Sequence, residues 1–417
     1  MSLNYRSVTF LLGLIVTAPI YGQKKADLSR FVVAGDSLSA GYQNSQLIES
    51  GQVHGYANVI ATQAGVSLNL PLVLPLGYPQ ISLEQNYAVV TGLNPATWLL
   101  NNQPTLDVAV PGFTVGALVG LQPSCTPNPA NPIEVMAAEI LNPLCHSNPG
   151  PTELAEAVSL KPTTAILWIG SNDALFSLLF VDTPPTDALT FSGLYDAAAT
   201  TMANASGHLV VANIPDVTLT AYLTSVPKLA AILGFPVPTV FGLYPGDMVT
   251  PYAFPVIQAM GSSLTVLPDS VLTASGSPVP IVIRAATLSD IRAHVIAYNG
   301  AIAQEAKANG ATLVDIYSLI NDLAANGVVV GGQKLTTDFM GGLFSLDGVH
   351  PTNTGYAIIA NEFIKTMNQS LHTGIPPVSI EQVSKTDPLI FPDSHPGKHT
   401  GHVDVGMADA LRHMHRQ

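Results

Sequence analysis

Four short turns along the chain carry residues of the types that acyl transfer needs. The first, Gly35-Asp36-Ser37, follows the apolar run Phe31–Ala34. A buried strand is expected to end there. If a helix follows, the Ser37 hydroxyl lies at its positive end, where free backbone N–H groups can stabilise a developing anion. Such a turn is also typical of a plain helix cap, so the case for Ser37 as a nucleophile depends on the other three turns.

The last turn supplies a base and a carboxylate. A hydroxyl is a poor nucleophile near neutral pH until a base takes its proton, and His350 stands in a turn with Asp347 three residues before it. Asp347 can hold the imidazole in the required tautomer and favour its protonated form as Ser37 attacks. We therefore predict that Ser37, Asp347 and His350 are the catalytic residues.

The two middle turns supply candidate donors for the oxyanion that forms when a carbonyl is attacked. Gly112 follows the apolar run Leu106–Val110, and Asn172 follows the apolar run Thr164–Ile169. The backbone N–H groups of Ser37 and Gly112 and the side-chain amide of Asn172 are the predicted oxyanion hole.

Read in order, these four blocks carry a family resemblance. They are Gly-Asp-Ser-Leu at 35–38, Pro-Gly-Phe-Thr at 111–114, Gly-Ser-Asn-Asp at 170–173 and Asp-Gly-Val-His-Pro at 347–351. The chain resembles the GDSL or SGNH hydrolases over about residues 30–370. The resemblance implies an α/β fold, a flavodoxin-like three-layer α/β/α sandwich with a central parallel sheet, and esterase or lipase activity. It also implies the same roles for Ser37, Gly112, Asn172, Asp347 and His350.

The elements around the turns repeat a strand, turn and helix pattern. Strands are expected at 31–34, 106–110, 164–169, 208–214 and 312–316, and helices at 56–64, from 115, at 153–160, 195–206, 287–309 and 354–367. This alternation is typical of a parallel sheet with helices on both faces, where ligands bind at the carboxyl ends of the strands. Asp36 and Asp173 are expected to hold turn N–H groups, and Trp168 is expected in the core.

Composition limits the class of protein. Charged residues make up only 10% of the 417, but 34 Gly and 33 Pro divide the apolar stretches into short pieces. After the N-terminal segment no apolar run reaches the ~18–20 residues that span a bilayer, so no stable transmembrane insertion of the mature chain is expected. The net charge of −13, with no stripe of Lys and Arg, argues against a nucleic-acid partner.

The chain divides into a leader, one large domain and a tail. Residues 1–22 are typical of a signal peptide cleaved near Gly22, which predicts a secreted or periplasmic protein. The hydrolase domain is expected over 27–372. An apolar, Pro-rich insertion at about 218–286 either covers one edge of the crevice or forms an ordinary loop layer. Residues 373–417 are expected to be a mobile tail, whose five His are more typical of a solvated segment than of a metal site.

Cys125 and Cys145 are the two cysteines of the chain. Their even number, loop setting and exported context predict a disulfide. Two free thiols are the alternative. Together with His146 they could be imagined as metal ligands, but no fourth ligand accompanies them, so no metal site is predicted.

The sequence thus predicts a secreted serine esterase or lipase that hydrolyses carboxylic esters through an acyl-Ser37 intermediate, with no metal or organic cofactor. Its substrate is expected to be a small-molecule or lipid ester, and the apolar insertion favours fatty or aromatic acyl groups. An acyltransferase or a carbohydrate deacetylase using the same site is one alternative. A noncatalytic binding protein on this scaffold is another. No feature of the sequence indicates an oligomeric state.

Overall fold

A computed structural model describes residues 25–73, 80–81, 89–90, 104–128, 131–234, 237, 241–260, 265–272 and 278–390. The expected signal peptide at 1–22 and the five His of the tail lie outside these ranges. Among the described helices, none is long and apolar enough to cross a membrane.

The centre of the fold is a parallel sheet. Its strands, in the order in which they pair, are β1 (Phe31–Gly35), β4 (Thr164–Trp168), β5 (His208–Ala212) and β11 (Thr312–Val314). The segment 106–110 lies parallel beside β1, where the Val33 N–H donates to the Leu106 carbonyl (2.8 Å) and the Val110 N–H to the Gly35 carbonyl (3.2 Å). With this segment counted second, the order is 2-1-3-4-5, that of flavodoxin-like folds. The predicted fold class is therefore confirmed.

Both faces of the sheet are buried, because successive side chains of each strand enter opposite cores. In β1, Val32 and Ala34 join one apolar cluster, while Phe31 and Val33 join the other. In β4, Leu167 faces the first cluster and Trp168 the second, so the prediction that Trp168 packs in the core is confirmed. These strands are continuous apolar runs in the sequence because neither face meets water.

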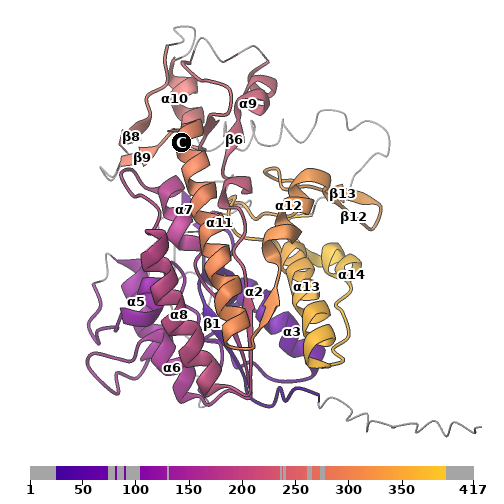
Figure 1. Cartoon of the computed structure of the whole chain (residues 1–417). Helices are drawn as coiled ribbons and strands as arrows, with labels where there is room; N and C mark the ends of the chain where they lie inside the picture. The colour runs from indigo at the N-terminus through magenta and orange to yellow at the C-terminus, as the bar shows by residue number, and fades with distance from the viewer. Residues whose placement is uncertain are drawn as a thin grey trace, which may run out of the picture.

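Helices cover the two faces as separate layers (Figure 1). The first layer contains α4 (Val115–Gly120), α5 (Pro132–Leu141), α6 (Glu153–Ser159), α8 (Ala188–Ala205) and α11 (Ala285–Ala308). The second contains α3 (Tyr56–Ala64) and α13 (Asn353–Leu371), with α14 (Ile380–Thr386) packed on α13. The other elements outside residues 218–286 are α1 (Ser37–Ala40), α2 (Glu49–Gln52), β2 (Gln80–Ile81), β3 (Val89–Val90), α7 (Ser171–Leu179), the 3₁₀ turn η2 (Val217–Leu219), α12 (Ile316–Asn326), β12 (Val328–Val330) and β13 (Gln333–Leu335).

The described residues of 218–286 form a small unit at one end of the molecule (Figure 1). It contains β6 (Thr224–Ser225), α9 (Val226–Leu233), β7 (Met248–Val249), α10 (Ala253–Met260), β8 (Ser270–Leu272), β9 (Pro278–Pro280) and β10 (Val282–Ile283). β6 and β10 both pair antiparallel with β7, and the unit has its own apolar cluster around Leu229, Phe241 and Ile281. The described residues of the insertion therefore pack around an apolar cluster of their own.

Most of the expected elements are present, but some of their ends differ because of contacts that are distant in sequence or because of local caps. The helix predicted to begin at Thr287 begins at Ala285 instead, since Asp247 of the insertion accepts a hydrogen bond from the Ala285 N–H (2.9 Å) and also pairs with Arg284. The last strand ends at Val314 rather than at Ile316, because Asp315 caps a helix, α12, that was not predicted.

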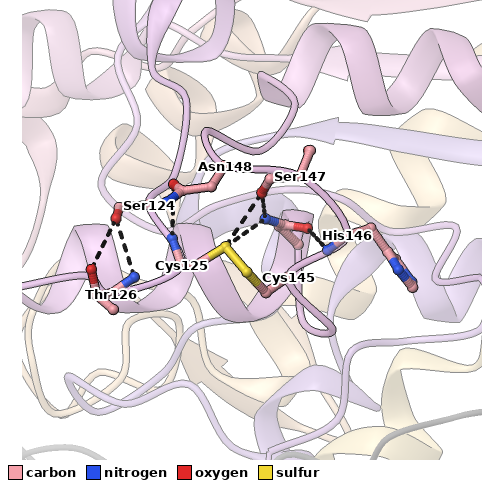
Figure 2. Close-up of a disulfide and its surroundings, with 8 residues drawn as sticks. Ser124, Cys125, Thr126, Cys145, His146, Ser147 and Asn148 are labelled. Carbon is pink, nitrogen blue, oxygen red and sulfur yellow. Dashed lines mark hydrogen bonds between the residues drawn. A yellow bond between two sulfur atoms is a disulfide. The ribbon is translucent and has the colours of Figure 1, made fainter.

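The disulfide between Cys125 and Cys145 is present, with the Cα atoms 5.4 Å apart, so this prediction is confirmed (Figure 2). Asn142 supports its loop: the side-chain amide donates to the Ser147 carbonyl (2.7 Å) and the side-chain oxygen accepts the His146 N–H (3.0 Å). Among the described residues no free cysteine remains.

The expectation of a mobile segment from residue 373 is wrong for 373–390. Asn368 and Asn361 on α13 accept hydrogen bonds from the N–H groups of Ile375 and Val378 (2.8 Å each) and donate to the carbonyls of the same two residues. Beyond α14, the buried carboxylate of Asp387 accepts the N–H and hydroxyl of Thr354 (2.8 and 2.7 Å). The sequence did not reveal this packing because side-chain amides, rather than an apolar periodicity, hold the segment to α13.

Replacement of Asp387 by Ala is expected to lower the free energy of unfolding by about 1–3 kcal/mol, because it leaves the buried N–H and hydroxyl of Thr354 without an acceptor. Urea denaturation of the wild type and the variant measures this. Glu381→Ala is the matched control, since Glu381 is an exposed partner of Lys385, and its loss should leave the free energy of unfolding nearly unchanged. Equal losses in the two variants would show that Asp387 does not anchor the segment.

Candidate active site

Ser37 is the first residue of the short helix α1, directly after β1. Asp36 caps this helix, and its side chain accepts the Leu38 N–H (3.0 Å), which confirms its expected structural role. Position 35 requires Gly because a side chain would not fit, and not because of its φ angle. A Cβ there would lie 2.3 Å from the Trp168 carbonyl oxygen of the neighbouring strand. The close approach of β1 and β4 therefore fixes the position of the Ser37 turn.

His350 bridges Ser37 and Asp347. Its Nε2 lies 2.8 Å from the Ser37 Oγ, and its Nδ1 lies 2.9 Å from Asp347 Oδ2. Ser37 and His350 are 313 residues apart in the chain. A carboxylate at Nδ1 keeps a proton on that nitrogen, so Nε2 is free to accept the hydroxyl proton of Ser37.

Asp347 is held by a dense set of hydrogen bonds. Its Oδ1 accepts the N–H groups of Val349 and His350 (2.8 Å each), and its Oδ2 accepts the Ser45 N–H (2.8 Å) in addition to the His350 ring. Burial of the carboxyl works to raise its pKa, but the nearby His350 and these hydrogen bonds outweigh burial and lower the pKa of Asp347 to about 2. Asp347 is thus a carboxylate at any pH at which an esterase works.

Two further residues that position the base were not predicted from the sequence. The Tyr42 ring packs against the His350 ring with centroids 4.8 Å apart. Asn44 accepts the Leu346 N–H (2.9 Å) through its side chain. Asn44 and Ser45 both have positive φ (52° and 58°), which lets this short loop turn toward the Asp347 turn. Asn and Ser after the Ser37 block were the available signal, but such residues occur in many loops.

The candidate oxyanion donors lie at neighbouring strand ends. The Val110 N–H donates to the Gly35 carbonyl, so Gly112 and Ser37 each follow this pair by two residues. The Asn172 side-chain amide donates one hydrogen to the Phe113 carbonyl (2.8 Å), which ties the third block to the second. Asn172 lines the same cavity as Ser37 and His350. The structure therefore brings the four predicted blocks to one edge of the sheet.

Asp173 is a structural residue, as predicted. Its Oδ2 accepts the Val115 N–H at the start of α4 (2.9 Å), and its Oδ1 accepts the Thr186 hydroxyl (2.8 Å). Burial raises the pKa of this carboxyl to about 6. Asp173 thus holds the second block, the third block and the loop before α8 together.

Three buried carboxyl groups lie behind the nucleophile turn. Glu153 on α6 accepts the Gly35 N–H (2.6 Å), and Asp107 accepts the Ala109 N–H (3.2 Å). Burial raises the pKa of Asp36 to about 7 and that of Asp107 to about 8, and it raises the pKa of Glu153 well above its usual range. These groups favour the neutral, protonated form in the folded protein.

Comparison with known families agrees with this geometry. Residues 31–363 match the family model of the GDSL-like lipases and acylhydrolases. The chain belongs to this family, whose members are hydrolases of the esterase and lipase type. No curated protein matches the chain.

Solved structures with a detectable likeness include three hydrolases. LAE5, an α/β hydrolase from the metagenome of Lake Arreo, Spain, has 15% sequence identity and a TM-score of 0.37, and the match covers 83% of this chain and 97% of LAE5. The acetylxylan esterase Axe2 of Geobacillus stearothermophilus has 12% identity and a TM-score of 0.39, with 85% of this chain and 99% of Axe2 covered. A lipase/acylhydrolase of Enterococcus faecalis has 10% identity and a TM-score of 0.35, with 84% of this chain and 98% of that protein covered.

The raised pKa of Asp107 predicts that the free energy of unfolding depends on pH. The unfolded chain releases this proton near its usual pKa of about 4, whereas the folded chain keeps it up to about pH 8. Between these values the folded state binds more protons, so the free energy of unfolding falls as pH rises. Asp107→Asn keeps the acceptor and cannot ionise, so the variant should be more stable than the wild type by about 2 kcal/mol or more at pH 8, with the difference shrinking toward pH 5.

Thermal unfolding of both proteins between pH 5 and 8 measures this difference. Asp182→Asn, at an exposed position, is the control and should follow the wild type at every pH. A constant offset between Asp107→Asn and the wild type across the range would contradict the prediction.

Proposed function

We propose that this chain is an exported serine esterase that hydrolyses carboxylic esters through an acyl-Ser37 intermediate. The observation that carries the proposal is the hydrogen-bonded series from Asp347 through His350 to Ser37, with distances of 2.9 and 2.8 Å. A base within hydrogen-bond reach of a hydroxyl, itself oriented by a carboxylate, is the arrangement that activates a serine nucleophile.

In the acylation step, the Ser37 Oγ forms a bond to the carbonyl carbon of the ester while its proton moves to His350 Nε2. The carbonyl oxygen takes the negative charge. When the bond from carbon to the alkoxy oxygen breaks, the same proton passes from His350 to the departing alcohol. The Asp347 carboxylate stabilises the imidazolium that exists between these two transfers.

In the deacylation step, a water molecule gives its proton to His350 Nε2 as its oxygen attacks the acyl carbon. Collapse of the intermediate breaks the bond to the Ser37 Oγ and returns the proton to it, so the carboxylic acid leaves and the enzyme is restored. In both steps the N–H groups of Ser37 and Gly112 and the second amide hydrogen of Asn172 would stabilise the oxyanion.

Export is part of the proposal. A disulfide forms and persists in oxidising compartments, so the pair Cys125 and Cys145 supports a periplasmic or extracellular location. The basic, apolar and small-residue order of segment 1–22 supports it independently.

Replacement of Ser37 by Ala is expected to reduce turnover of 4-nitrophenyl acetate or butyrate by at least about 10⁴-fold, because no other group can form the acyl intermediate. The folded state should be retained, as judged by circular dichroism. A fluorophosphonate probe should label the wild type at Ser37 and leave the variant unlabelled. Unchanged turnover in Ser37→Ala would refute the assignment, and failure to label the wild type would favour a noncatalytic binding protein.

The acyl acceptor is tested with the same substrates. Adding a primary alcohol at increasing concentration should leave the acid as the main product if water is the natural acceptor. Predominant transfer to the alcohol would favour an acyltransferase. Release of acetate from an acetylated polysaccharide, without turnover of simple esters, would favour a carbohydrate deacetylase.

Replacement of Asn172 by Ala is expected to lower kcat by about 10²–10³-fold with little change in KM, because one oxyanion donor is lost in the transition state only. Ser177→Ala is the matched control on the same helix, since its buried hydroxyl has no hydrogen-bond partner among the described residues. Steady-state kinetics of the three proteins distinguish the two positions, and equal values of kcat would rule out Asn172 as a donor.

A further inference from the structure

Two cavities share one lining residue, Thr220, and one of the two contains the candidate catalytic residues. The inner cavity, of about 50 Å³, is lined by Ser37, Asn172 and His350 together with Trp168, Ile316 and Ile320. The outer cavity, of about 160 Å³, is lined by residues of the insertion and of the segment before the Asp347 turn, among them Leu223, Met248 and Phe339. The sequence predicted a crevice at the carboxyl ends of the strands, but not the outer cavity beside it.

The inner cavity is suited to an apolar group. Beyond the catalytic residues its wall consists mainly of the side chains of Leu38, Leu175, Val217, Phe344 and Ile359, together with those named above. Its volume accommodates about three to five water-sized groups, taking about 10–15 Å³ for each. A butyryl chain, with three carbons beyond the carbonyl, fits this space, whereas an octanoyl chain does not.

The acyl part of the substrate fits this cavity better than the alcohol part does. The alcohol must take a proton from His350, leave, and be replaced by water, so its side of the site has to communicate with solvent. The acyl group stays attached to Ser37 through both steps. A pocket whose walls include Trp168 (1% exposed) and Asn172 (4% exposed) fits the group that remains.

Thr220 separates the two cavities, since it lines both of them. Its hydroxyl donates to the Val217 carbonyl (3.1 Å), which fixes the side chain at the end of η2. One face of α12 passes along both spaces: Ile316 and Ile320 line the inner cavity, and Ala324, four residues further, lines the outer one. A smaller residue at 220 would join them along this face.

We propose that the inner cavity binds the acyl group of short-chain esters, up to about four carbons, and that Thr220 sets this limit by closing the cavity toward the outer one. This inference rests on the proposed function and names the substrate class of the same site. It replaces the preference for fatty or aromatic acyl groups that composition alone had suggested for the insertion.

The test compares kcat/KM for 4-nitrophenyl esters from acetyl to decanoyl in the wild type and in Thr220→Ala. For the wild type, kcat/KM should rise toward butyryl and fall by about tenfold or more at octanoyl. In Thr220→Ala the ratio of octanoyl to butyryl should increase by about tenfold or more, because the chain can extend into the outer cavity. Thr220→Val keeps most of the side-chain volume and loses the hydrogen bond to the Val217 carbonyl, so because volume sets the limit its ratio should stay within about twofold of the wild type.

Thr220→Ser retains the hydroxyl and loses one methyl group, so it should give a smaller shift in the same direction. This variant also serves if Thr220→Ala does not fold. A wild type that prefers octanoyl, or equal ratios in Ala, Ser and Val variants, would overturn the proposal. A profile that changes with the alcohol in a series of acetate esters, and not with the acyl chain, would also overturn it.

These outcomes are distinct from failure of the proposed function. If the wild type turns over esters and Ser37→Ala does not, the esterase assignment stands whichever acyl profile is found. If the fluorophosphonate probe fails to label Ser37, the assignment itself fails before chain length is considered.

Discussion

The candidate active site depends on one buried carboxylate. Asp347 accepts hydrogen bonds from two N–H groups of its own turn, from the His350 ring and from the Ser45 N–H. The last of these joins the turn to the loop that follows the nucleophile, so a single side chain sets the distance between two segments encoded about 300 residues apart. Because the carboxylate satisfies several donors at once, its charge is stabilised despite burial, and it stabilises the imidazolium in turn.

The sheet supplies the rigid base for this arrangement. Its parallel strands are buried on both faces, and their carboxyl ends bring the Ser37, Gly112 and Asn172 turns to a common edge. The fold places three buried carboxyl groups, including Glu153 on the Gly35 N–H, in and behind the Ser37 turn, and burial raises the pKa of each. In their neutral form these carboxyls can accept backbone hydrogen bonds without adding negative charge close to the proposed oxyanion hole.

The insertion at 218–286 contributes to the surroundings of the site rather than to its chemistry. It has its own apolar cluster and is tied to the domain by the Asp247 carboxylate at the start of α11. The salt bridge of Lys228 with Asp338 connects it to the segment before the Asp347 turn. Because the outer cavity lies between these two parts, the insertion, which includes Thr220, limits the space beyond the candidate catalytic residues.

The sequence by itself determined the parallel α/β fold, the disulfide and the residues of the four blocks. Apolar runs that end in Gly-containing turns are local features, as is the Asp-x-x-His spacing, and local features can be read from a single chain. Only the tertiary structure decided how these parts meet: that Glu153 holds β1, that Ser45 holds Asp347, that Asp387 anchors residues 373–390, and that Thr220 stands between two cavities. Each of these is a contact or a volume between segments far apart in sequence, made by single polar side chains that leave no periodic pattern, so it exists only once the chain has packed.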